Sequence, residues 1–209
     1  LQPRAVHVFK PKGFGGLTGL ALRSRIPVFV DSDDWEGDGG WNQAGSYGPA
    51  QRRVFEWQER TLLRTAHGVT AASTLLYQRA RLARAADRPD SVWMIPNGLN
   101  RAWFARLVAA RCAARPALDQ PRTVLLYSRF AEFGVDWLPR FARALDRVAD
   151  CPVRIVVVGA DGKSWASGER VFIEMHGYVE RQSIPAILGN ADIAVFPYES
   201  SLLTMAKQS

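Results

Sequence analysis

Four carboxylates stand close together in one short stretch of the sequence, VFVDSDDWEGDGGWN at residues 28–42. Asp31, Asp33, Asp34 and Glu36 come directly after a hydrophobic run, and glycines and tryptophans follow them. Like charges repel one another and resist burial, so such a group needs a cation, a shared proton or open solvent. Each of these conditions corresponds to a different chemistry and to a different class of protein.

Two aspartates at this spacing after a strand suit metal chemistry. Asp31 and Asp33 fit a magnesium-dependent phosphatase with an aspartyl nucleophile, or a metal-dependent sugar transferase. A calcium loop of the EF-hand type is excluded, because it would need glycine at Glu36 and glutamate at Asn42. A polar loop that ends the strand and caps the next helix explains the residues without a metal, so on these residues alone the alternatives stay open.

The net charge of +7 at neutral pH permits binding to nucleic acid, to an anionic membrane surface or to an acidic small ligand. Only four of the 27 Lys and Arg residues are lysines, and the arginines are spread along predicted helices rather than gathered with aromatic residues. This distribution does not favour nucleic acid as a partner. A basic protein that binds nucleic acid or a membrane surface remains the non-enzymatic alternative.

The composition, with 47% hydrophobic and 22% charged residues, is typical of a globular protein that buries a sizeable core. No apolar run approaches the roughly 20 residues of a membrane-spanning helix. The expected location is the cytoplasm, with the inner membrane surface as an option if the basic helix predicted at residues 101–114 touches lipid. No zinc site is expected, because the cysteines and histidines are scattered: Cys112, Cys151, His7, His67 and His176.

Apolar runs recur along the chain with helix-like segments between them. The runs are continuous in Val, Ile and Leu rather than alternating with polar residues, which is typical of strands buried on both faces of a parallel sheet. The sequence therefore predicts an α/β fold. The predicted strands span residues 5–9, 26–30, 68–72, 92–95, 123–127, 153–158, 171–175 and 192–196, and the predicted helices span 48–66, 73–86, 137–149 and 181–191.

One segment, residues 100–122, interrupts this alternation. It is rich in Arg, Ala and Pro and contains no predicted strand. The sequence therefore predicts a first domain at residues 1–99, a linker at 100–122 and a second domain at 123–209.

Glycines and an arginine follow the strands of the predicted second domain. Arg129 comes after one strand, and Gly159 and Gly162 come after the next. Glycines at such a turn let an anion approach backbone amides, and an arginine can grip two phosphate oxygens. Tight turns also use glycine for geometry alone, so both interpretations stay open.

The last third of the sequence carries the motifs of a known family. A strand, the turn Gly177-Tyr178-Val179, a helix ending in Ala191-Asp192 and a strand ending at Pro197 resemble the C-terminal domain of family 4 (group 1) glycosyltransferases. Further segments resemble the family's motifs in the family's order over nearly the whole chain: AVHVFKP, VFVDSDDWE, HGVTAAS, IPNGLN, VLLYSRF and IVVVGADG.

The resemblance implies a GT-B fold, in which two facing Rossmann-like domains bind the donor on the second and the acceptor on the first. It implies a retaining glycosyltransferase that moves a sugar from a nucleotide diphosphate-sugar donor to a hydroxyl of a glycan, lipid or small molecule, without a separate cofactor or a metal. It also implies that each domain is incomplete here. The family's glycine-rich loop would precede Leu1, and its acidic E-x7-E region would lie at or after Ser209, so the chain alone is expected to be inactive.

On the donor side, the resemblance assigns roles residue by residue. It implies that Arg129 pairs with the donor diphosphate and that Gly159 and Gly162 shape the turn beside the nucleotide. It also implies that the backbone of the next glycine turn contacts the base and that the acidic residue after the last strand contacts the donor; these residues are Gly177, Tyr178, Val179 and Glu199.

On the acceptor side, the chain departs from the family. Asp33, with Asp34 beside it, stands where the family usually has histidine, and a carboxylate here is expected to orient an acceptor hydroxyl or to steady positive charge on the anomeric carbon. The family's lysine after the arginine is missing, and Lys207 is the candidate that replaces it. Trp35 and Trp41 offer flat faces for sugar rings.

Overall fold

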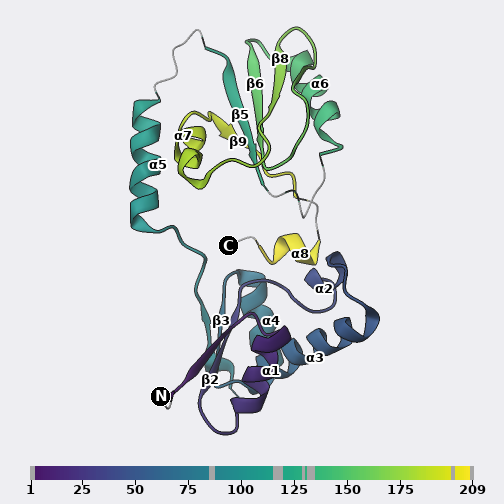
Figure 1. The fold of residues 1–209 in the computed structure, drawn as a ribbon, viewed down its shortest axis with the longest axis vertical. Coiled ribbons are helices and arrows are strands. Elements are labelled where there is room, and N and C mark those ends of the chain that lie inside the picture. The colour runs from purple at the N-terminus through teal and green to yellow at the C-terminus, as the bar shows by residue number, and fades with distance from the viewer. Residues whose placement is uncertain are drawn as a thin grey trace. The chain divides into compact units, whose positions relative to one another are not determined.

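The computed structural model describes residues 3–84, 88–114, 120–128, 130, 135–198 and 201–207 (Figure 1). The described residues fall into two compact units. The first contains the residues up to Gly98 together with 201–207, and the second runs from Leu99 to residue 198. This division differs from the predicted one at two places, because the predicted linker contributes a helix to the second unit and the C-terminal stretch belongs to the first.

The first unit is built from a sheet and the helices that connect its strands. Its elements are β1 (Val6–Phe9), α1 (Gly13–Leu22), β2 (Val28–Ser32), α2 (Trp41–Ala44), α3 (Pro49–Thr65), β3 (Gly68–Ala71), α4 (Thr74–Arg84), the 3-10 helix η1 (Pro89–Ser91), β4 (Val92–Met94) and α8 (Leu202–Met205).

The four strands of this sheet are parallel and follow one another in chain order, β1-β2-β3-β4. Because every right-handed crossover then advances in the same direction, the connecting helices collect on one face of the sheet (Figure 1). One core accordingly joins Val30 and Val69 of the sheet to Leu20 of α1, Leu62 of α3 and Ala80 of α4. This arrangement leaves the carboxyl ends of β1, β2 and β3 at one edge, where the loops begin.

Helix α1 was not predicted, because glycine disfavours helix and its sequence is GFGGLTGLAL. The glycines serve close packing instead. A Cβ at Gly16 would lie 2.9 Å from the Gln58 side chain on α3. The same Gln58 holds the start of α1, since its Oε1 accepts from Gly13 N at 2.8 Å and its Nε2 donates to Gly13 O at 3.1 Å.

The second unit contains a mixed sheet and the helix from the predicted linker. Its elements are α5 (Arg101–Ala113), β5 (Arg122–Tyr127), α6 (Leu138–Val148), β6 (Val153–Val158), β7 (Trp165–Ala166), β8 (Val171–Met175), the 3-10 helix η2 (Arg181–Ser183), α7 (Ile184–Gly189) and β9 (Ile193–Ala194).

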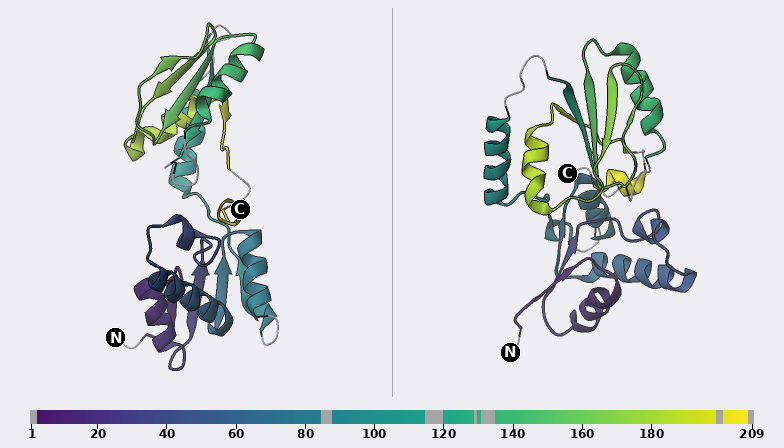
Figure 2. Two further views of the ribbon diagram at one scale, coloured as in Figure 1. Left: turned by 90° about the vertical axis from the view of Figure 1, so that its right-hand side faces the viewer. Right: turned by 45° about the horizontal axis from the view of Figure 1, so that its top comes forward.

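The direction of winding reverses in this second sheet, whose order is β7-β8-β6-β5-β9. The strands are parallel except β7, which pairs antiparallel with β8. From β5 the chain advances to β6 and β8 and then crosses back to place β9 on the other side of β5. Helices α6 and α7 therefore pack on opposite faces (Figure 2). In open α/β sheets, ligands bind outside the carboxyl ends of the strands at such a reversal, which here lies between β5 and β9.

Helix α5 lies against α7 in the second unit (Figure 1). Gly189 permits this contact, since a Cβ there would lie 2.8 Å from the Ala110 carbonyl carbon. Arg111 Nη1 donates to Gly189 O at 3.2 Å and to Ala191 O at 2.9 Å, so it caps the end of α7. Among the residues that the structure describes, no helix is both long enough and apolar enough to cross a membrane.

Each predicted strand overlaps an observed one. The continuous apolar runs gave β5, β6 and β8 to within one residue, whereas β9 covers only two residues of the predicted 192–196. The short strand β7 forms an edge hairpin with β8 and was not predicted.

Candidate functional site

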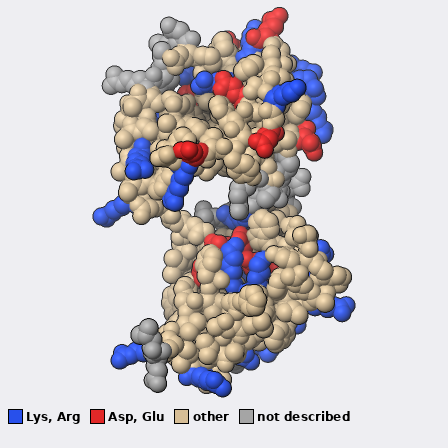
Figure 3. Space-filling view, viewed as in Figure 1, with Lys and Arg blue, Asp and Glu red and all other residues tan. Residues whose placement is uncertain are grey.

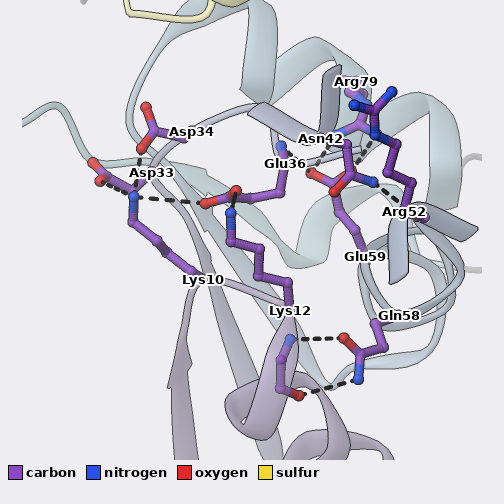
Figure 4. Close-up of polar contacts among 11 residues, drawn as sticks. Lys10, Lys12, Asp33, Asp34, Glu36, Asn42, Arg52, Gln58, Glu59 and Arg79 are labelled. Atoms are coloured by element: carbon purple, nitrogen blue, oxygen red, sulfur yellow. Dashed lines mark hydrogen bonds and ion pairs between the residues drawn. The ribbon is translucent and has the colours of Figure 1, made fainter. Parts of the chain in front are cut away.

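The carboxylates that follow β2 receive their counter-charges from the loop between β1 and α1 (Figure 4). Strand β1 pairs in parallel with β2, so the loops after both strands leave from the same edge. Lys10 Nζ donates a hydrogen bond of 2.5 Å to Asp34 Oδ2, and it lies 3.8 Å from Asp33 Oδ2 and 3.5 Å from Glu36 Oε1. Lys12 pairs with the other oxygen of Glu36. The cation that the acidic stretch requires is therefore supplied by the chain itself.

The backbone of Lys10 is unusual for a residue with a side chain. Its φ is 62°, in the left-handed region that favours glycine. Its N–H donates to Asp31 O at 3.2 Å, continuing the contact between β1 and β2 beyond the strand. Such strained residues cluster at functional sites, and this turn brings the Lys10 ammonium over the carboxylates.

Glu36 is the innermost member of this group, with 0% of its side chain exposed. Within the part of the chain that the structure describes, neither of its oxygens receives a hydrogen bond. The two lysine ion pairs alone balance its charge. An uncompensated buried carboxylate is costly, so the ion pairs with Lys10 and Lys12 stabilise Glu36 inside the fold.

The charges in the cluster stabilise one another. Burial alone would raise the pKa of Asp34, but the hydrogen bond and charge of Lys10, then the Trp41 side chain and the charge of Lys207, lower it below its ordinary value. Burial would likewise lower the pKa of Lys10, yet its hydrogen bond to Asp34 and the charges of Asp34, Glu36 and Asp33 raise it. Both groups therefore stay ionised at neutral pH.

The free energy of unfolding of the first unit is expected to fall in acid, because the stabilisation that ionised Asp34 contributes is lost there. Its folded pKa lies below the ordinary 3.8, so its stabilisation is fully present above that pH and is lost as the pH falls through the folded pKa. Urea unfolding from about pH 6 down to about pH 2 should show a shallower loss of stability in Asp34→Asn than in the unchanged chain. The exposed Asp90→Asn is the control; equal slopes for Asp34→Asn and the unchanged chain would contradict the assignment.

The remaining aspartates have separate partners. Asn97, in the turn after β4, donates from Nδ2 to Asp33 Oδ1 at 2.8 Å. Thr70 Oγ1 donates to Asp31 Oδ1 at 2.5 Å. The two aspartates considered as a magnesium pair are thus each bound by groups of this chain. In the described ranges, no cluster of three or more His, Cys, Asp or Glu side chains is arranged to hold a metal ion.

A second ion pair supports the acidic loop from behind (Figure 4). Glu59 on α3 is fully buried and accepts two hydrogen bonds from Arg79 on α4, at 2.6 and 2.7 Å. Glu59 Oε1 also accepts from the Glu36 backbone N–H at 3.1 Å. The Arg79 guanidinium lies 4.2 Å from the centroid of the Trp35 ring. Two helices thereby fix the loop that presents the carboxylates.

Lys207 lies in the first unit, beside the acidic loop. Helix α8 places it there, since Ala206 packs with Ala71 and Leu76. Lys207 Nζ lies 4.8 Å from the centroid of the Trp41 ring. Basic and acidic side chains accordingly adjoin one another on this unit in the space-filling view (Figure 3). Three of the chain's four lysines gather at this one site: Lys10, Lys12 and Lys207.

The predicted donor-side glycines come together at the carboxyl edge of the second sheet. Gly159 and Gly177 both have positive φ, 101° and 58°, and Gly159 N donates to Gly177 O at 2.6 Å. Gly162 packs against Met175. Tyr178 is 73% exposed, whereas Val179 packs into the core beneath α7. Arg129 and Glu199 lie outside the described residues.

Several residues near these edges were missed from the sequence. Lys10 and Lys12 come from a segment 24 residues away from their partners, and the shared edge of β1 and β2 was the signal that could have located them.

A hollow of about 570 Å³ adjoins the turn after β8, where Arg181 lies 5.2 Å from the centroid of the Trp103 ring. No short motif marks that pair.

The chain resembles known proteins in sequence over its first unit and in fold. Residues 1–98 match the family described as glycosyl transferase 4-like domain. The chain is similar to sucrose-phosphate synthase from Thermosynechococcus elongatus, with 19% identity and a TM-score of 0.60 over 93% of this chain and 50% of that one. It is also similar to Anabaena HepE, solved in complex with UDP-glucose, with 17% identity and a TM-score of 0.47 over 90% and 52%. No curated protein sequence matches significantly.

Residues 1–98 therefore form a glycosyl transferase 4-like domain. The α/β fold with its two sheets matches about half of a GT-B glycosyltransferase chain, and the predicted fold class is confirmed. The chain spans about half the length of the two solved structures.

Proposed function

We propose that the protein is a retaining glycosyltransferase that moves a sugar from a nucleotide diphosphate-sugar donor to an acceptor hydroxyl. The observation that carries this proposal is the match of residues 1–98 to the glycosyl transferase 4-like family. The first unit would bind the acceptor and the second unit the donor.

The topology of the second sheet supports a donor site there. The winding reverses between β5 and β9, and in the sequence Arg129 and Glu199 follow these two strands. Gly159 and Gly177 have positive φ, which favours glycine in these turns, and glycine turns after a buried strand let a phosphate group approach backbone amides. The Gly159 amide itself is bonded to Gly177 O, so the neighbouring amides would serve. We assign Arg129 to the diphosphate and the Gly177–Val179 backbone to the base.

The carboxylates of the first unit suit an acceptor that offers hydroxyl groups. Asp33 and Asp34 offer carboxylate oxygens, which accept hydrogen bonds from hydroxyl groups. Their charges are balanced by lysines of the chain, so the site does not demand a cationic ligand. Trp35 and Trp41 each have one ring face against a cation, Arg79 and Lys207, and the acceptor sugar would meet the aromatic edges or the opposite faces.

Catalysis would come from stabilising the charge that develops on the leaving diphosphate. Arg129 would pair with two of its oxygens, Lys207 is our candidate for a second cation, and the glycine-turn amides would complete the set. Each well-placed donor of this kind is typically worth about 3 kcal/mol in the transition state. Asp33 would orient the attacking hydroxyl.

Calorimetric titration of UDP and GDP into the full-length protein tests this assignment. Arg129→Ala is expected to weaken binding of the recognised nucleotide about 30-fold, because it removes charged hydrogen bonds to the diphosphate. Arg129→Lys should recover only part of the loss, since it keeps the charge without the bidentate geometry. Arg140→Ala, an exposed arginine on α6, is the matched control. Unchanged binding in Arg129→Ala would refute the donor-site assignment.

A further inference from the structure

One ammonium group lies within ion-pair distance of three carboxylates in the first unit. Lys10 Nζ is 2.5 Å from Asp34, 3.5 Å from Glu36 and 3.8 Å from Asp33. A divalent cation bound by carboxylates has the same environment of several anionic oxygens around one positive centre. Lys10 therefore occupies the position at which a carboxylate-rich site would otherwise bind a cation.

Each of the three carboxylates has other partners besides Lys10, but those partners differ from one carboxylate to the next. Glu36 is balanced by Lys12 as well as Lys10. Asp34 is faced by Lys10, by the Trp41 side chain and by the charge of Lys207, and Lys10 donates a hydrogen bond to it. Asp33 is faced by Lys10 and by the neutral Asn97. Lys10 is thus common to all three carboxylates.

We propose that Lys10 is the built-in cation of this site, a positioning residue that holds Asp33 and Asp34 in place so that they accept hydrogen bonds from a neutral polyhydroxy acceptor. The part that concerns the acceptor rests on the proposed glycosyltransferase function. The left-handed backbone at Lys10, with φ of 62°, is energetically unfavourable for a residue with a side chain, and glycine would adopt it more readily. This conformation directs the Lys10 ammonium toward the carboxylates.

The same backbone provides a clean variant. Lys10→Gly removes the ammonium and suits the left-handed conformation, so the fold should be retained. In the full chain, carboxyl-carbon NMR titration is expected to show that the pKa of Asp34 rises in Lys10→Gly and falls again when ethylammonium chloride is added. Potassium chloride at equal ionic strength should not restore it. Lys163→Ala, which alters the one lysine outside this site, should leave Asp34 unchanged.

Two results would overturn the role of Lys10: an unchanged Asp34 titration in Lys10→Gly, or equal restoration by potassium chloride, which would indicate general screening. In the full-length protein, Lys10→Gly is expected to reduce kcat about tenfold with the donor KM unchanged, and ethylammonium should restore part of it. Normal turnover in Lys10→Gly would exclude a functional role for this cation.

If the unchanged full-length protein transfers no sugar, the proposed glycosyltransferase function is wrong. The NMR titration still decides in that case whether Lys10 is the cation of the site.

Discussion

Replacing Glu59 by glutamine is expected to lower the free energy of unfolding of the first unit by about 3 kcal/mol. The Glu59 side chain is fully buried and receives two hydrogen bonds from Arg79 and one from the Glu36 backbone. Glutamine keeps the shape but loses the charge, and its amide N–H groups face the donors of Arg79. The guanidinium is then left partly buried without a counter-charge, which is the costly way to break a buried pair.

The same substitution one turn earlier on α3 supplies the control. Glu56 pairs with Arg60 at 3.8 Å; the Arg60 side chain is exposed and that of Glu56 is partly exposed, in contrast to the fully buried Glu59. Glu56→Gln should therefore change stability by less than about 0.5 kcal/mol. Urea unfolding followed by circular dichroism measures both variants. Similar losses for Glu59→Gln and Glu56→Gln would show that the buried pair does not support the acidic loop.

Replacing Arg84 by methionine is expected to cost about 4 kcal/mol of unfolding free energy. Arg84 is only 2% exposed at the end of α4. It donates to the carbonyls of Leu63, Ala66 and His67 at the end of α3, and to Ser91 Oγ. Methionine fills the space but leaves these carbonyls without their donor in a buried region, and unsatisfied buried groups are expensive.

Arg81 on the same helix is the matched control for this second prediction. Its side chain is exposed and lies near the Tyr77 ring, so Arg81→Met should alter stability by about 0.5 kcal/mol or less. Equilibrium unfolding in urea, or hydrogen exchange of the β3 and α3 amides, reports the difference. A loss of stability in Arg84→Met no larger than in Arg81→Met would disprove the anchoring role.

The strands of the second sheet were the most predictable, because a parallel sheet covered by helices on both faces favours continuous apolar runs. Val153–Val158 is the clearest case, since nearly every residue of β6 is buried. Helix α1 was not predictable from propensity, because Gly16 is explained only by the approach of Gln58, and Gly19 by the approach of Val8 and Leu62. Strand β9 is shorter than its apolar run, with both residues exposed in the described chain.

The sequence alone predicted the carboxylates of the site but did not predict the lysines that pair with them. Asp33 and Asp34 stood out as a cluster of like charge that needed compensation. Lys10 and Lys12 did not stand out, because a lysine pair separated by one residue has no local pattern and its partners lie elsewhere in the chain. Lysine is scarce in this arginine-rich sequence, and that scarcity was the unused signal. Nothing local marked Glu59 and Arg79, which meet only when α3 and α4 pack together.

The most direct test of the glycosyltransferase assignment is nucleotide binding by the unchanged full-length protein. UDP and GDP are titrated calorimetrically, once with a chelator and once with magnesium. We expect one of the two nucleotides to bind equally well in both conditions, because the proposed phosphate-binding groups are Arg129, Lys207 and backbone amides. Absence of binding, or binding that needs magnesium, would contradict it and favour a metal-dependent reaction at Asp31 and Asp33.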